Sequence, residues 1–257
     1  MQKTQGVSGL RNEGAKMEEK DIKAIREILN NARHAVFFGG AGMSTESGIP
    51  DFRGAGGLYT SEGKGNEYYL SRRCLTVDPR AFYRFYNSNM VFPDAKPNRA
   101  HYALAQLEKR GVIRAVITQN IDGLHQAAGS KRVIELHGTV SRFYCMRCGK
   151  VFDPDFVATA EDIPKCSACG GIVRPDVTLY GESLDGFTFR DAENEVAQAD
   201  VLIVGGSSLT VYPAASLIGN FSGKHLIIIN YSPTAYDASA EYVIHASVSD
   251  VLLMLCE

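Results

Sequence analysis

The chain has 257 residues, of which 22% are charged and 45% hydrophobic, and its formal net charge is -2. This length is enough for one well-buried α/β core with a small second lobe. The nearly balanced charge provides no basic surface for nucleic acid, and no apolar run approaches the roughly 20 residues of a membrane span. Residues 1–16 lack the apolar segment of a secretory signal, so we expect a loose tail and a cytoplasmic protein.

Apolar residues at regular spacing predict alternating helices and strands. Residues 17–32 have a helical period, and an apolar strand follows at 35–38. The other expected helices are an aromatic-rich one around 81–86, an amphipathic one at 98–110 and one that ends at residue 199. The other expected strands are at 112–117, 201–204 and 226–229. Because strand, polar loop and helix repeat, we expect a parallel sheet with its ligand at the carboxyl ends of the strands.

A glycine-rich turn follows the first strand. Gly39, Gly40 and Gly42 allow backbone N–H groups to approach a phosphate with no Cβ in the way, which predicts a dinucleotide cradle. Thr45 stands where the pattern G-x-G-x-x-G has its third glycine. A second turn of this type, Gly-Gly-Ser-Ser, follows the later strand at 205–208.

Four of the six cysteines form two pairs with metal-ligand spacing. The pairs are Cys145-x2-Cys148 and Cys166-x2-Cys169, separated by seventeen residues, as in a zinc ribbon. The alternative, two disulfides, requires an oxidising compartment, for which the chain shows no export signal. Four thiolates complete the shell of a tetrahedral ion, so we expect one structural zinc ion.

The motifs in this order resemble those of the sirtuins, and the chain is identified as a Sir2-like, prokaryotic-type member of that family. The motifs besides the cysteine pairs are GAGMSTESGIPDFRG (40–54), TQNIDGLH (118–125), ELHG (135–138), RPDVTLYGE (174–182), GGSSLTVYP (205–213) and IIIN (227–230). Any one of these motifs alone is weak, but the set covers nearly the whole chain from about residue 20.

The resemblance implies an α/β fold, with a Rossmann-like parallel sheet, helices on both faces and a smaller lobe that contains the zinc ribbon. The catalytic domain would span 17–257, with residues 1–16 as a tail. The large lobe is expected at about 17–53, 78–138 and 176–257. The small lobe is expected at about 139–175, together with a flexible loop region at about 54–77.

The resemblance also implies an NAD-dependent protein lysine deacylase, which gives nicotinamide, O-acyl-ADP-ribose and free lysine. Asn120 and Asp122 match the pair that holds the nicotinamide amide group, since an amide and a carboxylate complement its donors and acceptor. His137 would be the general base, because imidazole has an ordinary pKa near about 6.5. His125, on an expected helix, is given a structural role.

The cofactor-binding positions implied by the resemblance are distributed over several loops. They are Gly40, Ala41, Thr45, Asp51, Phe52, Arg53, Gln119, Asn120, Ile121, Asp122, His137, Gly206, Ser207, Ser208, Asn230 and Val248. Arg53 would neutralise phosphate charge, and Phe52 would shield the reactive face from water. The serines would donate at a helix N-terminus. For Val248, a role as an ordinary core valine stays open.

The partners implied are acylated lysines in proteins or peptides, with no direct nucleic acid and no membrane. The expected substrate residues are Thr178, Tyr180, Gly181, Glu182, Val211 and Tyr212, with Leu179 beside Thr178 in the tunnel for the acyl-lysine. An extended peptide would be held as an added strand. Many sirtuins have an aromatic residue at Thr178 and Leu179, and desuccinylating members have Tyr-x-x-Arg where this chain has Tyr86-x-x-Asn89. We therefore expect acetyl or other apolar acyl groups rather than succinyl.

Three alternatives stay open from the sequence. A nicotinamide oxidoreductase would share the sheet, but it is expected to have the full glycine pattern and an acidic ribose ligand about 20 residues later. A zinc-ribbon binding module would need a one-sided charge, whereas the ribbon mixes Arg147 and Lys150 with Asp153 and Asp155. Mono-ADP-ribosyl transfer uses the same bond cleavage and is excluded only weakly.

Overall fold

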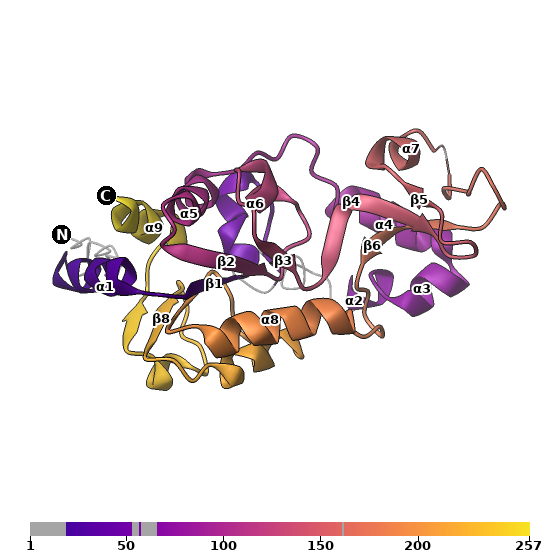
Figure 1. Cartoon of the computed structure of the whole chain (residues 1–257). Helices are drawn as coiled ribbons and strands as arrows, with labels where there is room; N and C mark the ends of the chain where they lie inside the picture. Colours follow the sequence, from indigo (N-terminus) through magenta and orange to yellow (C-terminus); the bar gives the residue numbers. More distant parts are fainter. Residues whose placement is uncertain (1–18, 53–56, 58–65, 161) are drawn as a thin grey trace, which may run out of the picture.

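The computed structural model describes residues 19–52, 57, 66–160 and 162–257. Figure 1 shows an elongated arrangement of this part of the chain, with a parallel sheet and its helices on one side and a smaller antiparallel sheet on the other. The expected tail at 1–16 and most of the expected loop region at 54–77 lie outside the described residues.

The larger sheet has six parallel strands among the described residues, in the order β3-β2-β1-β7-β8-β9. The strands are β1 (Ala35–Gly39), β2 (Ile113–Thr118), β3 (Val133–Glu135), β7 (Val201–Gly205), β8 (His225–Ile229) and β9 (Tyr242–Ile244). From the central strand β1 the chain continues outward to β2 and β3, and it later returns beside β1 to continue through β7, β8 and β9. The expected fold class is confirmed. The strands β3 and β9 were not predicted, because three residues are too few to show a period.

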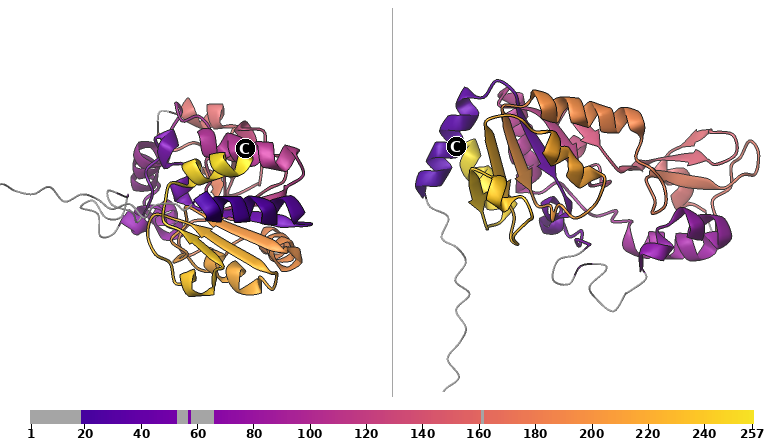
Figure 2. Two further views of the ribbon diagram at one scale, coloured as in Figure 1. Left: turned by 90° about the vertical axis from the view of Figure 1, so that its left-hand side faces the viewer. Right: turned by 90° about the horizontal axis from the view of Figure 1, so that it is seen from below.

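Helices bury both faces of this sheet (Figures 1 and 2). One face is covered by α1 (Glu19–Asn31), α5 (Arg99–Lys109) and α9 (Val248–Cys256). The other is covered by α8 (Gly186–Gln198) and the 3-10 segment η3 (Ala214–Asn220). Successive side chains of β1 serve the two cores in turn: Phe37 packs in the first, and Val36 and Phe38 pack in the second. All three are fully buried, as in a strand that is covered on both sides.

The smaller sheet has the order β5-β4-β6 and is antiparallel, with β4 (Gly138–Cys145), β5 (Val151–Phe152) and β6 (Val173–Val177). Helices α3 (Arg72–Val77) and α4 (Pro79–Asn89) contribute buried residues to its core, and α7 (Pro154–Ala158) packs against it. The short helix α2 (Asn66–Tyr69) contacts α3 and α4. Phe82 and Tyr86 of α4 are buried in this core, and the Tyr86 ring lies edge-on to Phe143 with centroids 6.5 Å apart. Helix α4, which the expected division assigns to the large lobe, thus packs against the smaller sheet, and the lobe bounds as a whole stay a prediction.

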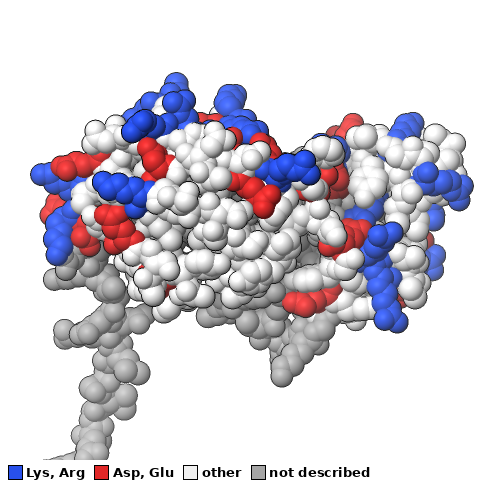
Figure 3. Space-filling view, turned by 60° about the horizontal axis from the view of Figure 1, so that its bottom comes forward, with Lys and Arg blue, Asp and Glu red and all other residues white. Residues whose placement is uncertain are grey.

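The described residues include no helix that is both long and apolar enough to cross a membrane. On the face shown in Figure 3, lysines and arginines alternate with acidic residues, and no broad basic surface is seen there. This distribution gives no electrostatic support on that face for binding nucleic acid.

A pair of buried histidines lies between α5 and α6 (Leu124–Ala127). The rings of His101 and His125 pack edge-to-face with centroids 4.8 Å apart, and the two residues are 0% and 1% exposed. Nδ1 of His101 contacts Asn98, but the other three ring nitrogens have no hydrogen-bond partner among the described residues. Burial is the largest cause that lowers the pKa of both imidazoles, so both are neutral at pH 7.

This pair predicts acid sensitivity. Because the pKa of each ring in the folded protein lies below its ordinary value of about 6.5, the unfolded chain binds more protons and stability falls as the pH decreases below that value. Once the pH is well below about 6.5, each histidine should lower the free energy of unfolding by about 1.4 kcal/mol for every pH unit of further decrease. Urea unfolding between pH 7 and about 5 measures the slope. A His125→Leu variant should show a shallower slope, and an unchanged slope would contradict this account.

Candidate active site and metal site

The site begins where β1 and β7 lie side by side and their connections leave in opposite directions, which is the place where open α/β sheets bind ligands. The two predicted glycine turns meet here through their backbones. Gly40 N donates to Gly205 O at 3.2 Å, and Gly42 N donates to Gly206 O at 2.9 Å. A Cβ at Gly42 would lie 2.8 Å from Gly206 Cα. The two turns are therefore in direct backbone contact at the switch point, where open α/β sheets have their ligand crevice.

Asn120 and Asp122 follow β2 and are joined through a buried serine. Asn120 Nδ2 donates to Ser44 Oγ at 3.0 Å, and Ser44 Oγ donates to Asp122 Oδ2 at 2.6 Å. The other carboxylate oxygen of Asp122 accepts from Leu124 N at 2.9 Å. Ser44 is 1% exposed and was not predicted, although it lies within the glycine-rich segment. The structure thus brings the two expected nicotinamide contacts together and adds a third residue that fixes their orientation.

His137 connects β3 to β4, and its ring orientation is fixed by the backbone. Its Nδ1 lies 2.9 Å from Gln119 O, and because a carbonyl only accepts, Nδ1 carries the proton and Nε2 is the basic nitrogen. Burial lowers the pKa of His137, and the bond to Gln119 opposes this shift. A neutral imidazole with Nε2 unprotonated is the form that a general base needs.

Gly138, directly after this histidine, has φ +79, and a Cβ there would lie 2.1 Å from Asp176 O. Only glycine fits this position, where the chain passes from the larger sheet to the smaller one. Thr178 N donates to His137 O at 2.8 Å, so the end of β6 is fixed to the same residue.

Gln119 connects this histidine to the second glycine turn. Its Nε2 donates to Ser207 Oγ at 2.8 Å, and that oxygen also accepts from Leu209 N at 3.2 Å. Ser207 is buried and Ser208 is exposed. No helix starts at these residues, because the next helical segment is η3, so the serines lie in a loop and not at the expected helix N-terminus. Gly206 has φ +61, a left-handed conformation that glycine adopts without strain.

The remaining expected cofactor contacts lie around this crevice. Ala41 and Thr45 are in the 3-10 turns η1 (Ala41–Met43) and η2 (Thr45–Ser47), and Thr45 is exposed. The half-buried positions among the others are Asp51, Phe52, Ile121 and Asn230, and Arg53 lies outside the described residues. Asn230 follows β8, as expected. Its side-chain amide donates to Ser232 O at 2.7 Å.

Val248 is the first residue of α9. It is 6% exposed and packs in the core on that face of the sheet. A Cβ at Gly205 would lie 3.1 Å from Cγ1 of Val248, so the valine side chain packs against the end of β7. The observed packing is that of a core valine, and a contact with adenine stays a prediction.

The expected substrate residues divide into two groups. Thr178, Tyr180 and Gly181 follow β6 in the chain. The backbone of Tyr180 pairs with the start of α3, where Arg72 N donates to Tyr180 O at 3.0 Å. Tyr212 is 68% exposed and Val211 is half-buried. That these two segments hold a peptide between them stays a prediction.

Two neighbouring residues have partners within the protein. Leu179 is 3% exposed and packs in the core of the smaller lobe, and its place beside an acyl-lysine tunnel stays a prediction. The carboxylate of Glu182 accepts from Arg174 at 2.5 and 3.0 Å and from Leu179 N at 2.9 Å. The Arg174 side chain is 3% exposed, so this is a buried ion pair that shapes the loop. A substrate contact at Glu182 would have to use its backbone.

The four predicted cysteine ligands converge. All their Sγ atoms lie within 4.8 Å of one another, with Cys145 to Cys169 at 3.5 Å and Cys148 to Cys166 at 3.6 Å. Zn–S bonds of about 2.3 Å in a tetrahedron place sulfurs about 3.8 Å apart, whereas a disulfide bond is about 2.05 Å long. The residues therefore fit one zinc ion with a closed shell of four thiolates, which is a structural site.

Comparison with known proteins agrees with this geometry. A model of the Sir2 family matches residues 40–213. An NAD-dependent protein deacetylase of Clostridium acetobutylicum is 52% identical over 235 residues, which make up 90% of this chain and 96% of that protein. One from Cutibacterium acnes is 51% identical over 227 residues, 87% of this chain and 93% of that protein. The chain belongs to the Sir2 family.

Solved Sir2 structures extend the likeness to both lobes. A Sir2 complex with a p53 peptide and NAD+ has a TM-score of 0.81 at 41% identity, and covers 90% of this chain and 95% of that chain. Sir2Tm bound to a propionylated peptide has a TM-score of 0.81 at 40% identity with the same coverage. The predicted sirtuin resemblance is confirmed.

The backbone crevice of this Sir2-family chain predicts the effect of adding a methyl group. Gly42→Ala should weaken NAD binding and cost about 1–3 kcal/mol of stability, because the new Cβ overlaps the backbone of Gly206. Gly219→Ala is the matched control, since nothing lies within 4 Å of its Cβ position. The measurements are calorimetric NAD titration and the unfolding midpoint. Equal behaviour of the two variants would refute the proposed role of the crevice.

The cysteine cluster predicts that this Sir2-family protein needs its metal to stay folded. Cys166→Ser should abolish stoichiometric zinc and lower the melting temperature by about 10 °C or more, because a structural zinc ion supplies folding free energy directly. Cys256→Ser is the control, because Cys256 lies outside the cluster and its Sγ donates to Ala103 O at 3.3 Å. Metal analysis and thermal melts test both. A normal melt for metal-free Cys166→Ser would rule out a structural role.

Proposed function

We propose that the protein removes acetyl or other apolar acyl groups from lysine side chains of proteins or peptides and consumes NAD. The reaction also consumes one water molecule, and the products are nicotinamide, O-acyl-ADP-ribose and free lysine. The observation that carries this proposal is the fixed imidazole of His137, with Nε2 basic, beside the linked Asn120 and Asp122 and the backbone crevice. Related Sir2 structures with a deacetylated p53 peptide and 3'-O-acetyl ADP ribose, or with a propionylated peptide, support it.

NAD supplies an anomeric carbon from which nicotinamide departs and to which the acyl oxygen becomes attached. The diphosphate would lie against the glycine turns after β1 and β7, because these turns meet at the switch point of the sheet and have no side chains at Gly40, Gly42 and Gly206. Asn120 and Asp122 would hold the nicotinamide amide group, and Ser44 keeps both in register. An amide and a carboxylate provide the acceptors and donor that this group requires.

His137 would accept a proton at Nε2 from a ribose hydroxyl. The bond from Nδ1 to Gln119 O holds the required tautomer, and the lowered pKa keeps the ring neutral near pH 7. The side chain of Gln119 in turn donates to Ser207, so the base and the phosphate turn are joined through one residue. Phe52 and Arg53 stay assigned, as proposals, to shielding the reaction from water and to the phosphates.

The acyl group is proposed to be uncharged. In α4, Tyr86 is buried with its pKa raised by burial, and Asn89 Nδ2 donates to Phe85 O at 2.9 Å. The free carboxylate of a dicarboxylic acyl chain would need a cation beside it when buried, and neither residue provides one. Acetyl, propionyl and butyryl lysine are the favoured substrates.

We also infer that the larger sheet with its helices forms the NAD-binding lobe and that the cysteine-bearing sheet forms a structural lobe. A site of four thiolates is best maintained in a reducing compartment, which supports a cytoplasmic location. The peptide would bind between the loop around Tyr180 and the segment at Tyr212, as an added strand.

The test is turnover of a panel of acetyl-, butyryl- and succinyl-lysine peptides with NAD, followed by mass spectrometry. We expect free lysine and O-acyl-ADP-ribose from the first two peptides. His137→Ala should reduce turnover by roughly 10²- to 10⁴-fold, since it removes a general base, while peptide binding is retained.

Three outcomes would count against the proposal. Formation of NADH would indicate an oxidoreductase, and ADP-ribose attached to protein without loss of the acyl group would indicate ADP-ribosyl transfer. Undiminished turnover by His137→Ala would remove the proposed base.

A further inference from the structure

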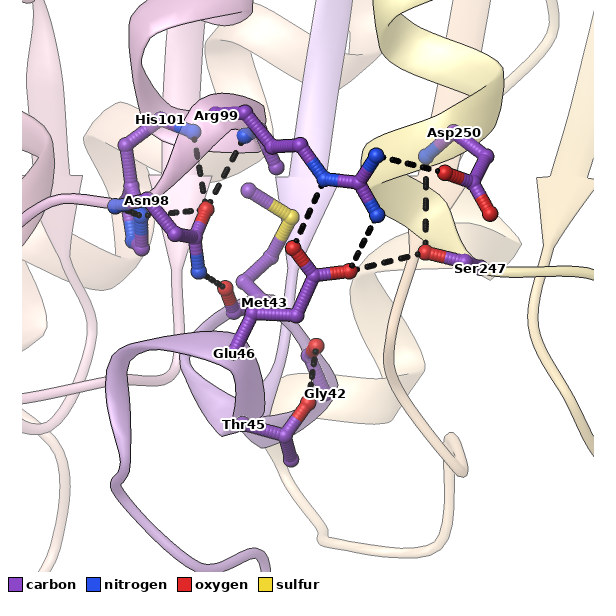
Figure 4. A network of polar contacts seen from close by, with 10 residues as sticks. Gly42, Met43, Thr45, Glu46, Asn98, Arg99, His101, Ser247 and Asp250 are labelled. Atoms are coloured by element: carbon purple, nitrogen blue, oxygen red, sulfur yellow. Dashed lines mark hydrogen bonds and ion pairs between the residues drawn. The ribbon is translucent and has the colours of Figure 1, made fainter.

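A charged network lies behind the turn that follows β1 (Figure 4). Glu46 is the central residue of η2 and directly follows Thr45, one of the expected NAD contacts. Its carboxylate points away from Thr45 toward α5 and α9. Figure 4 shows Arg99 and Thr45 on opposite sides of Glu46, so the arginine contacts the turn on the side away from Thr45.

Two nitrogens of the Arg99 guanidinium group bind the two oxygens of this carboxylate. Nε lies 2.9 Å from one oxygen of Glu46 and Nη2 lies 3.0 Å from the other, while Nη1 lies 2.8 Å from Asp250. Ser247 Oγ donates to Glu46 at 3.1 Å. A lone exposed ion pair contributes little, but a bidentate pair within a network of several charges is the arrangement that does contribute.

The network joins segments that are far apart in the chain. Arg99 is the first residue of α5. Ser247 caps α9 and Asp250 lies in its first turn, and α9 packs beside α5 on the same face of the sheet. Asn98, next to Arg99, adds a bond from its Nδ2 to Met43 O at 2.8 Å. The N-cap residue and the first residue of α5 therefore hold both 3-10 turns of the glycine-rich segment.

The charges give the arginine a second effect. Glu46 and Asp250 are two carboxylates next to a crevice proposed to receive a diphosphate, and Arg99 is the cation between them. Removing Arg99 would free the turn from α5 and α9 and would also leave two negative charges uncompensated. Both effects oppose the binding of an anionic dinucleotide.

We propose that Arg99 is a positioning residue for NAD: it holds the turn at 41–47 against α5 and α9 and neutralises Glu46 and Asp250 without touching the dinucleotide. This inference rests on the proposed function only for the identity of the ligand. It assigns a role to a residue outside the predicted site, and that role concerns NAD alone and not the peptide or the proton transfer.

The first experiment compares Arg99→Leu with a matched control. Arg99→Leu should raise both the Kd and the KM for NAD by roughly 5-fold or more, with kcat and the peptide KM unchanged within about 2-fold. Arg132→Leu is the control, because Arg132 is similarly exposed and pairs with Asp191 and Glu195, yet it immediately precedes β3 at the opposite end of the strands. This variant should leave NAD binding unchanged.

A double-mutant cycle separates the charge from the general stability of the fold. Glu46→Gln combined with Arg99→Leu should recover part of the lost NAD affinity, because the uncompensated carboxylate is gone. The NAD affinity of Arg99→Lys should lie between those of the wild type and Arg99→Leu, since lysine keeps the charge but cannot form the bidentate hydrogen bonds. Raising the salt concentration should reduce the difference between Arg99→Leu and the wild type.

NAD binding is measured by calorimetry without peptide, on protein shown by its thermal melt to be folded. If Arg99→Leu binds NAD as tightly as Arg132→Leu does, or if its peptide KM rises as much as its KM for NAD, the proposal is overturned. If NAD binds and responds to Arg99→Leu but no acyl-lysine is cleaved by the wild type, the positioning role stands and the proposed function fails.

Discussion

The direct backbone contact between the turns after β1 and β7 is the constraint on which the site depends. Gly42 N reaches Gly206 O at 2.9 Å, and this is possible only because neither residue has a side chain at that point. The contact fixes the two turns against each other at the switch point of the sheet, and it uses the N–H groups of Gly40 and Gly42. Because all strands of the sheet are parallel, the polar residues that follow β2 and β3 reach the same edge.

Much of the fold could be predicted because the information is local. Buried parallel strands appear as apolar runs, and the helices at 98–110 and 17–32 were predicted to within two residues of the observed α5 and α1 over the described chain. Metal-ligand spacing is also local, so the cysteine cluster was predicted completely. The strands β3 and β9 have three residues each and gain their structure from neighbouring strands. The packing of α4 depends on Phe143, which lies more than fifty residues away in the chain.

The parts of the site that could not be predicted depend on tertiary contacts. Ser44 gains its role only because β2 places Asp122 within 2.6 Å of it. Glu182 lies in a motif that suggested substrate binding, but the buried guanidinium of Arg174 occupies its carboxylate. Leu179 faces the core because its neighbours in the chain pair with the segment before α3. In each case the residue type was visible in the sequence, whereas the partner was set by the fold.

The position of His137 between the two sheets has a mechanical consequence. The chain crosses from one lobe to the other at Gly138, and the returning strand is tied to the same residue by the bond from Thr178 N to His137 O. If the cysteine-bearing lobe rotates relative to the larger sheet, the rotation axis would thus pass close to the imidazole. Its ring is held by Gln119 on the larger sheet. The imidazole would therefore keep its place relative to the larger sheet during such a rotation.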